Sequence, residues 1–424
     1  MTATITLPDG PTTPRAVQAL RFLADRNGTM HRLRDRYGTA FTVQTMNLGR
    51  VVMLADPAEV KQLFLAGADD IDIVDINLGS VLGRGSFFAI RGETHRQQRR
   101  LLTPPFHGRR LRAYESLIED EAVREMRAWP PGREFPVMPS MMRITLNVIL
   151  RAVFGADGAE LDELRRMLPA MVRVGSVLAV LPLPRSRYGP WRYFRRYRDR
   201  YDVVVDRLID RARRDPDLPS REDILAMLVQ ARYDDGTPMT RDQIADQLLT
   251  LLSAGHETTA TTLAWAVERL RRHPGVLDRL PGDPELLDAA IIEVQRVRPV
   301  IEMTTRQVRA ETVRIGRWTL PRGTIAAACI ALLHDDPALF ADPQTFDPDR
   351  FVGARPETYG WIPFGGGVRR CIGASFATLE MNVVLRTLVR DFVLEPTAAA
   401  GERRFNRGIA IAPAKGGRAV VRRR

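Results

Sequence analysis

The sequence predicts a mainly α-helical fold with a small β-rich part. Helical signals dominate: one capped segment runs from Thr240 to Arg271 without a proline or glycine run, and 119–156 and 161–230 read as helices separated by loops. Strand signals are short and few. They lie where glycine and proline punctuate apolar runs, at 41–54, at 312–330 and, as a C-terminal hairpin, at 403–421.

The long helical segment begins with a capping box. Thr240 is followed three residues later by Gln243, and each side chain can accept a hydrogen bond from the backbone N–H of the other residue. At about 1.5 Å per residue the segment is roughly 50 Å long, so it would cross the whole molecule.

The middle of this segment reads Ala254-Gly255-His256-Glu257-Thr258-Thr259. Gly255 weakens the helix, and threonine hydroxyls can bond back to carbonyls of the preceding turn. Seen alone, Glu257 and Thr258 are solvated or capping residues as readily as functional ones. His256 is expected to be structural or solvent-linked.

One of the two cysteines, Cys371, lies between the glycine-rich stretch 364–367 and the start of an apparent helix. Glycines permit positive φ and close backbone approach. Backbone N–H groups, the helix dipole and the charges of Arg369 and Arg370 would stabilise a thiolate, so the thiol should ionise well below its free pKa of about 8.5. Such a loop presents a thiolate to a metal. A buried cysteine beside an ordinary glycine turn is the alternative for this loop taken alone.

The stretch Phe364-Gly365-Gly366-Gly367-Val368-Arg369-Arg370-Cys371-Ile372-Gly373 fits the pattern Phe-Gly-x-Gly-x-(His/Arg)-x-Cys-x-Gly at every fixed position. It thereby resembles the haem-binding loop of the cytochrome P450 superfamily. The resemblance implies that Cys371 is the axial thiolate on haem iron, that Phe364 shields the sulfur and that Arg369 meets a haem propionate. It also places the fixed glycines Gly365, Gly367 and Gly373 in the cofactor loop.

Other motifs of the family occur in the right order. The string Ala-Gly-x-(Asp/Glu)-Thr, here ending in Glu257 and Thr258, implies that Thr258 hydrogen-bonds dioxygen and that Glu257 relays protons from water toward it. His95 and Arg99, one helical turn apart, and Arg306 resemble the ligands of the haem propionates. For Arg306 an ordinary surface arginine is the alternative.

Three further residues match positions with a structural role in the family. Glu293 and Arg296 match its Glu-x-x-Arg pair, and Arg350 matches the arginine of its Phe-x-Pro-x-Arg-Phe string. Alone, Glu293 and Arg296 would form a common surface ion pair worth a few tenths of a kcal/mol. The resemblance implies instead a buried network that fixes the cysteine loop and supports haem incorporation.

The length of 424 residues would by itself suggest two or three domains. No linker, composition break or repeat divides the chain, and the resemblance implies one cytochrome P450 domain over 1–424, with a lead-in and first helix in 1–40. The cofactor, haem b (iron protoporphyrin IX), is then expected between the long central helix and the helix that follows Cys371.

The chain is basic, with a formal net charge of +12 and 63 lysines and arginines, nearly all of them arginine. Arginines alternate with aromatic residues at 185–201, which is typical of nucleic-acid binding, yet the same residues fit an amphipathic helix with its aromatic side chains packed inward. We therefore expect no nucleic-acid partner. The charge is better explained by docking of an acidic electron donor near the thiolate side, by Arg96, Arg100, Arg109, Arg110 and Arg370.

Two cysteines argue against a disulfide framework. With Cys371 assigned to iron, Cys329 is most simply a small buried hydrophobic residue. Residues 1–10 lack the basic and apolar regions of a signal peptide, and the apolar stretch 172–183 is too short and too broken to span a bilayer. We expect a cytoplasmic protein without a membrane anchor.

These inferences predict a haem-thiolate monooxygenase that inserts one atom of O₂ into a hydrophobic organic substrate. The sequence has no flavin or iron–sulfur segment, so electrons would come from a separate ferredoxin or flavodoxin with its reductase. Two alternatives are a peroxide-driven peroxygenase, against which the intact Glu257–Thr258 pair argues, and a non-catalytic haem-binding sensor or carrier.

By analogy with the family, the substrate pocket would include Ala254, Val300, Ile301 and Met303. The apolar character of the last three favours a hydrophobic substrate, although Glu302 could recognise an amine or a hydroxyl group.

Overall fold

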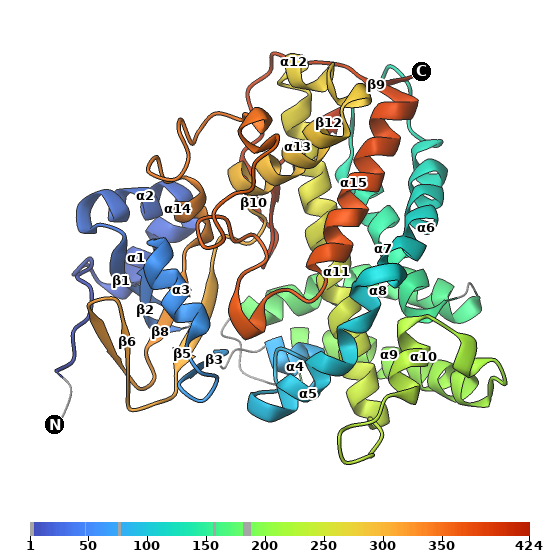
Figure 1. Ribbon diagram of the computed structural model, residues 1–424, viewed down its shortest axis with the longest axis horizontal. Helices are drawn as coiled ribbons and strands as arrows, with labels where there is room; N and C mark the ends of the chain where they lie inside the picture. Colours follow the sequence, from blue (N-terminus) through green and yellow to red (C-terminus); the bar gives the residue numbers. More distant parts are fainter. Residues whose placement is uncertain (1–3, 47, 75–77, 156–157, 181–187) are drawn as a thin grey trace. The chain divides into compact units, whose positions relative to one another are not determined.

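The computed structural model describes residues 4–46, 48–74, 78–155, 158–180 and 188–424 (Figure 1). The chain packs as two compact units, each assembled from separate stretches. The sheet unit comprises 1–76, 295–346 and 354–371, and the helical unit comprises 77–294, 347–353 and 372–424. Helix α13 (Pro284–Val297) begins in the helical unit and ends in the sheet unit. The expectation of a single domain over 1–424 stays a prediction.

The sheet unit is built on a five-stranded sheet of order β1-β2-β8-β5-β3, in which β2 and β8 are parallel and the other neighbours antiparallel. A separate hairpin pairs β6 with β7. The elements of the sheet unit are α1 (Arg15–Ala24), α2 (Arg26–Tyr37), β1 (Ala40–Thr45), β2 (Gly49–Leu54), α3 (Pro57–Leu65), β3 (Ile71–Asp72), β5 (Thr304–Val308), β6 (Thr312–Ile315), β7 (Trp318–Pro321), β8 (Ile325–Ala328), α14 (Ile330–His334) and the 3₁₀ turn η5 (Gly367–Arg369).

Both faces of this sheet are buried. Successive side chains of a strand point to opposite faces, and β2 divides accordingly: Val52 and Leu54 join one hydrophobic cluster, Val51 and Met53 another. Helix α3 packs on the first cluster, and α2 packs on the second through Met30. Burial on both faces explains why β2 and β8 read as continuous apolar runs in the sequence.

The sequence predicts one helix within 1–40, and the structure forms two. Asp25 takes an extended φ of −154°, and its carboxylate accepts the Gly28 N–H at 2.9 Å, which caps a new helix at Arg26. The single-helix prediction is wrong because this aspartate favours the N-cap over a helix interior.

The helical unit contains the remaining elements. They are α4 (Leu78–Leu82), α5 (Gly92–Leu102), η1 (Pro104–Phe106), α6 (Gly108–Met126), β4 (Phe135–Pro136), α7 (Met138–Phe154), α8 (Ala159–Val180), α9 (Pro190–Arg214), η2 (Leu218–Ser220), α10 (Ile224–Gln230), α11 (Arg241–Leu270), α12 (Pro274–Leu277), η3 (Leu280–Gly282), η4 (Pro348–Phe351), α15 (Ala374–Asp391), β9 (Phe392–Leu394), β10 (Arg404–Asn406), β11 (Ile411–Pro413), β12 (Arg418–Ala419) and β13 (Val421–Arg423).

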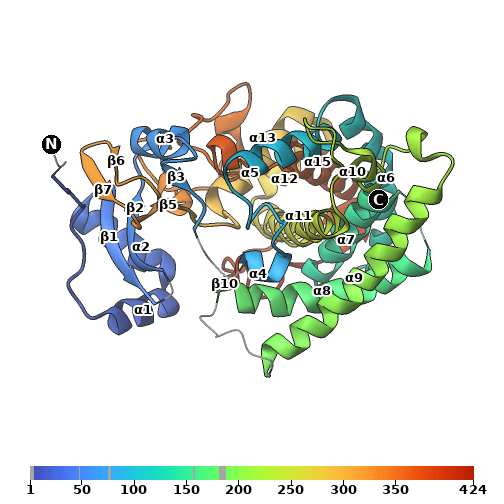
Figure 2. The same cartoon turned by 90° about the horizontal axis from the view of Figure 1, so that it is seen from below.

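Helix α11 forms the core of the helical unit, and Figure 2 shows it nearly end-on with α7 beside it. The predicted capping box is present: Thr240 Oγ1 accepts the Gln243 N–H at 3.2 Å, and Gln243 Oε1 accepts the Thr240 N–H at 2.9 Å. The helix has 30 residues and is therefore about 45 Å long. Among the helices of the described residues, none has both the length and the apolar character that crossing a bilayer requires.

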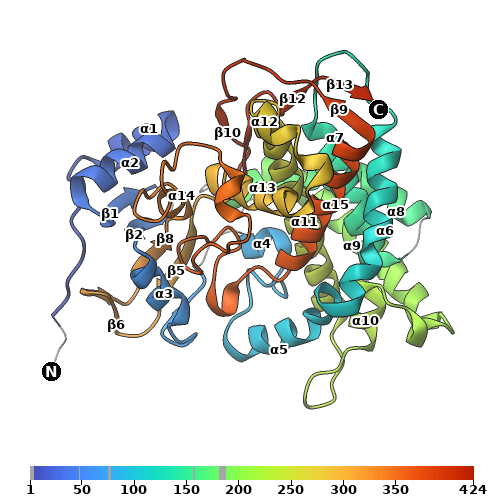
Figure 3. The ribbon, with the colours of Figure 1, turned by 45° about the horizontal axis from the view of Figure 1, so that its top comes forward.

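The C-terminal part of the helical unit is only partly the predicted hairpin. Strands β10 and β11 form it, whereas β12 pairs with β4 and β13 pairs with β9. Figure 3 shows α15 lying alongside α6. The sequence missed β4 and β9 because strands of two or three residues carry no alternating pattern.

The arginine- and aromatic-rich stretch 185–201 enters α9 at Pro190, and 185–187 lie outside the described residues. Trp191, Phe194 and Tyr201 are buried, as an amphipathic helix requires. Tyr188 and Tyr193 are exposed, so for these two the prediction of inward packing is wrong.

Candidate functional site

The cysteine loop belongs to the sheet unit and has the predicted glycine geometry. Gly365 and Gly367 both have a φ of 65°, a left-handed conformation that side chains disfavour. The Cys371 N–H donates to the Phe364 carbonyl at 2.9 Å, which closes the loop. Cys371 is exposed, and α15 begins shortly after it with Gly373 as its N-cap. The loop can therefore present a thiol to a ligand.

Phe64 of α3 packs against the loop at two glycines. A Cβ atom at Gly366 would overlap the Phe64 ring, and a Cβ atom at Gly367 would overlap the Phe64 carbonyl. Glycine is thus required at Gly366, a variable position of the motif. Phe64 could not be predicted from the sequence, because it is distant in the chain and belongs to no motif.

Arg369, a predicted propionate ligand, forms a buried ion pair with Asp72. Its Nε and Nη2 donate to Asp72 Oδ1 at 3.0 and 2.7 Å, and the two side chains are 7% and 4% exposed. The same oxygen also accepts the Ile73 N–H at 2.7 Å. Strand β3 carries Asp72 and pairs with β5, the strand that contains Arg306.

Arg306 is also buried. Its Nη1 donates to Thr304 Oγ1 at 3.1 Å and to the Thr305 carbonyl at 2.9 Å, and its guanidinium lies 5.6 Å from the centre of the Phe64 ring. Burial, and next the positive charge of Arg369, lower the pKa of Arg306 to about 10. The alternative of an ordinary surface arginine is therefore wrong.

This cluster suits a ligand that carries a carboxylate. Two of its three buried charges are positive, and within the described part of the chain no carboxylate lies at ion-pair distance from Arg306. A buried cation needs a counter-charge. Haem has carboxylates, and the sulfur donor of Cys371 belongs to the same unit, so the residues present fit the cofactor that the sequence predicts.

In the helical unit, the predicted acid–alcohol pair lies in an accessible window of α11. The structure describes 244–270 without a gap, and nearly every residue of this range is buried. The exceptions are Ser253, Ala254, Gly255, Glu257, Thr258 and Arg269. Five of these six lie within 253–258, where only His256 is buried, so the middle of the helix offers side chains to a ligand.

Thr258 and Glu257 are both engaged by groups of the helical unit. The Thr258 hydroxyl donates to the Ala254 carbonyl at 2.8 Å, so its oxygen lone pairs are directed to accept a hydrogen bond. Glu257 Oε1 lies 3.4 Å from Nε of Arg407, in the connection between β10 and β11. No sequence motif points to Arg407, because it contacts α11 only through the fold.

The burial and contacts of His256 indicate a structural role. It is buried, its Nδ1 lies 2.7 Å from the Leu252 carbonyl oxygen, and burial lowers its pKa. The Thr145 hydroxyl of α7 donates to the His256 carbonyl at 2.9 Å, which ties α7 to α11 at this level. The second cysteine, Cys329, is buried as predicted, and burial raises its pKa to about 12.

Helix α5 carries the two other predicted propionate ligands. His95 is buried, Arg99 is half-buried, and the His95 ring meets Phe87 edge-on at 5.6 Å. The neighbouring Gln98 fixes α5 to α11, because its Oε1 accepts a hydrogen bond of 2.6 Å from Gln247. The position of α5 is thus set by the buried hydrogen bond between Gln247 and Gln98, to which no sequence motif points.

Of the three residues predicted to form a buried network, Glu293 and Arg350 contact each other. In the helical unit, Glu293 Oε1 accepts the Asp347 N–H at 2.9 Å and lies 3.3 Å from Nε of Arg350. In the sheet unit, the buried Arg296 donates to three carbonyls, those of His334, Pro343 and Thr345.

The predicted pocket residues of the sheet unit are largely packed. Val300 is buried, Ile301 packs against one hydrophobic cluster and Met303 against the other. Glu302 is buried and pairs with Arg26 at 3.4 Å, which favours a structural role over substrate recognition.

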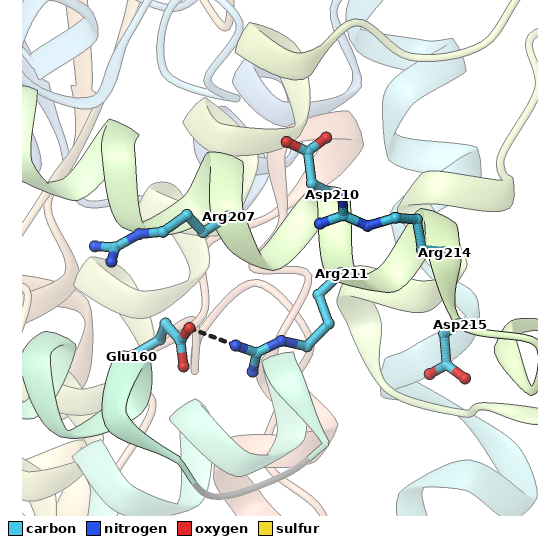
Figure 4. Close-up of a pocket in the computed structure, with 6 residues that line it drawn as sticks. All are labelled: Glu160, Arg207, Asp210, Arg211, Arg214 and Asp215. Carbon is cyan, nitrogen blue, oxygen red and sulfur yellow. Dashed lines mark hydrogen bonds and ion pairs between the residues drawn. The ribbon is translucent and has the colours of Figure 1, made fainter.

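A surface pocket of about 440 Å³ lies elsewhere, on α8 and the C-terminal end of α9 (Figure 4). Figure 4 shows Glu160 facing Arg211, with which it forms an ion pair. All six lining residues are charged, and none is a predicted site residue; they are Glu160, Arg207, Asp210, Arg211, Arg214 and Asp215. The pocket lies between α8 and α9, where charged side chains such as Glu160 and Arg211 form ion pairs between the two helices.

Comparison with known proteins identifies one family. The Cytochrome P450 family model matches residues 8–417. A Mycobacterium tuberculosis protein named cytochrome P450 138 is 49% identical over 99% of this chain and 97% of its own length. A Mycobacterium bovis protein named cytochrome P450 135B1 is 39% identical over 99% of this chain and 92% of its own length.

Two solved structures share the fold. One is described as retinoic acid bound cyanobacterial CYP120A1, with a TM-score of 0.87, 24% identity and coverage of 99% of this chain and 100% of that one. The other is the heme domain of cytochrome P450DA, with a TM-score of 0.85, 22% identity and coverage of 100% and 99%.

Proposed function

Because this chain belongs to the cytochrome P450 family, whose members are generally haem-thiolate monooxygenases, we propose that it inserts one atom of O₂ into a hydrophobic organic substrate. One observation carries the proposal: α11 is buried nearly throughout, yet it leaves an acid and an alcohol accessible side by side at Glu257 and Thr258. A carrier or sensor has no need of a proton-transferring pair at that place.

The proposed cofactor is haem b. Cys371 would bind the iron through its thiolate, with Phe364 and the glycines Gly365, Gly367 and Gly373 shaping the loop around the sulfur. Arg306 and Arg369 would bind a propionate, and His95 and Arg99 would serve the same purpose from the helical unit. When bound, haem supplies the centre at which O₂ is activated.

The proton chemistry falls to two residues of α11. Thr258 donates its own proton to the Ala254 carbonyl, so its oxygen is set to accept a hydrogen bond from a protonated group beside it. Glu257 can carry a proton, and its partner Arg407 is 37% exposed, which connects the carboxylate to solvent. We assign Glu257 to bring protons in and Thr258 to hold them in place.

Electrons would come from a separate ferredoxin or flavodoxin with its reductase. The basic residues expected to dock such a donor are partly neutralised: Arg96 pairs with Glu93 at 2.9 Å, and Arg100 pairs with Asp234 at 3.1 Å. Docking would therefore depend on the remaining arginines, and its rate should fall as salt screens them.

The test is turnover of the purified haem-loaded protein with a panel of hydrophobic compounds under ¹⁸O₂. Reactions contain NADPH with a surrogate ferredoxin and reductase, or hydrogen peroxide alone. The proposal predicts ¹⁸O in the product only with the electron-transfer system. Efficient turnover with peroxide and none with the electron-transfer system would identify a peroxygenase. Tight compound binding without product in either reaction would identify a carrier.

A further inference from the structure

Helix α1 of the sheet unit turns an apolar side to solvent. Val17, Leu20 and Leu23 follow one another at intervals of three residues and are 37%, 66% and 81% exposed. Ala16 and Ala24 lie on the same side of the helix and are exposed too, so the five residues form one apolar stripe. Figures 2 and 3 show α1 at the edge of the sheet unit, where α2 and β1 are its neighbours. A contiguous exposed stripe, unlike single exposed side chains, marks an interaction surface.

The opposite side of α1 holds the helix in this orientation. Gln18 is 3% exposed, and its Nε2 donates to the carbonyls of Pro11 and Thr13 at 3.1 and 2.8 Å. Its Oε1 accepts the Gln44 N–H of β1 at 2.9 Å. Phe22, one turn further along α1, packs against a hydrophobic cluster of the sheet. Turning the helix to bury the apolar stripe would leave the Gln18 amide without these partners, which is costly. The fold therefore keeps the stripe at the surface.

The charges of α1 are positive. The helix contains no acidic residue, and its charged residues are Arg15 and Arg21, both exposed. Arg21 lies one turn after Val17 and therefore borders the apolar stripe. The next acid along the chain, Asp25, pairs with Arg32 at 3.4 Å. An apolar stripe bordered by arginine favours a partner that is apolar inside and negatively charged at its surface.

We propose that α1 docks the protein on the surface of an anionic lipid bilayer. A helix with an apolar face and basic flanks lies in the plane of the headgroups, with its apolar side chains among the acyl chains and its arginines beside the phosphates. The formal net charge of +12 attracts the chain to such a surface. At ten residues α1 is about 15 Å long, so it lies on the bilayer and does not span it.

A second copy of the chain fits this surface less well. Two copies related by a two-fold axis would bring the same surface of each together, and with it two positively charged α1 helices. Stable protein interfaces also cover about 800 Å² on each partner, far more than one side of a ten-residue helix offers. Docking on lipid is independent of the proposed reaction, although a bilayer would also hold hydrophobic substrates close to the protein.

The test is sedimentation of the purified full-length protein with vesicles of phosphatidylcholine alone, or of phosphatidylcholine and phosphatidylglycerol in equal parts. The wild-type protein should sediment with the mixed vesicles, and added salt should weaken this binding. A double variant, Leu20→Gln with Leu23→Gln, should bind the mixed vesicles at least about tenfold more weakly, because two apolar side chains no longer enter the lipid. Arg21→Gln should weaken binding roughly fivefold, and only to the mixed vesicles.

Leu65→Gln is the matched control. Leu65 ends α3 in the same unit and is 62% exposed, close to the value for Leu20. Its replacement should leave vesicle binding unchanged. The urea midpoint of unfolding of every variant should match that of the wild-type protein, because substitutions at exposed positions change stability little.

Two results would overturn the proposal directly. They are a wild-type protein that stays in the supernatant with mixed vesicles, and a double leucine variant that binds them as tightly as the wild type does. A dimer in light scattering that the same double variant dissociates, without any vesicle binding, would identify a second copy as the partner instead. These measurements require no substrate turnover, so their outcome is separate from that of the monooxygenase test.

Discussion

Replacing Glu293 by alanine should destabilise the haem-loaded protein by about 3–5 kcal/mol. The Glu293 side chain is fully buried, and its Oε1 accepts the Asp347 N–H and contacts Nε of Arg350, which is itself only 14% exposed. Removing one partner of a buried ion pair leaves a charge without its counter-ion in a medium of low dielectric, and this costs about 3–5 kcal/mol. Total stabilities are about 5–15 kcal/mol, so little folded protein would accumulate.

A neighbouring ion pair provides the matched control. Asp349 lies in η4 beside Arg350 and pairs with Arg279 at 2.7 and 2.8 Å, distances shorter than that between Glu293 and Arg350. The side chains of Asp349 and Arg279 are, however, about half exposed. Asp349→Asn should therefore cost less than about 1 kcal/mol. The predicted cost is larger for Glu293 than for Asp349 because the Glu293 ion pair is buried, not because its distance is shorter.

The assay is urea unfolding followed by tryptophan fluorescence, together with the haem content per chain. The prediction requires a large loss of both stability and haem for Glu293→Ala and nearly none for Asp349→Asn. Wild-type stability and full haem loading in Glu293→Ala would refute the assignment of Glu293 as a buried anchor.

Three further outcomes follow from the described contacts. Thr258→Ala should release more hydrogen peroxide per molecule of product in the reconstituted system, and an unchanged ratio would show that this hydroxyl is dispensable. His334 is buried, and burial, then the charge of a nearby arginine, lower its pKa to about 3 from 6.5. The unfolded chain therefore binds a proton that the folded chain does not, and stability should fall by about 2 kcal/mol between pH 8 and pH 5. His334→Gln should remove this part of the pH dependence in urea unfolding, while His107→Gln, at an exposed position, should retain it. Arg306→Gln should stabilise the haem-free chain by up to about 3 kcal/mol, because a pKa of about 10 instead of 12.5 implies a penalty of that size for the buried charged guanidinium. The same variant should lose haem faster to an acceptor protein, and slower loss would contradict the assignment of Arg306 as a propionate ligand.

Features that arise from neighbouring residues could be predicted from the sequence. The capping box at Thr240 sets where α11 begins, and the uninterrupted pattern after it sets its length. The glycine spacing before Cys371 indicates positive φ angles, which the loop adopts at Gly365 and Gly367. In each case the controlling interactions lie within a few residues.

Contacts between distant segments could not be predicted in this way. Asp72, Phe64 and Arg407 contact site residues, but each lies in an element far from its partner in the chain. Their residue types are also unremarkable by themselves, since an aspartate or arginine is common on any surface. The strand that carries Asp72 has two residues and exists only because β5 pairs with it.

Exposure was also misjudged where an alternating pattern was ambiguous. Tyr188 precedes α9, so no helix face buries it. Tyr193 is next to the buried Phe194, and adjacent residues of a helix cannot both lie at the centre of its buried face.

The most direct test of the account is the absorption spectrum of the purified protein, reduced under carbon monoxide, compared with that of Cys371→His. A thiolate ligand predicts a strongly red-shifted Soret band in the wild-type protein and its loss in the variant, even where haem stays bound. A wild-type band typical of imidazole or thiol ligation, or a band that Cys371→His leaves unchanged, would contradict the assignment of Cys371 as the iron ligand and with it the proposed monooxygenase.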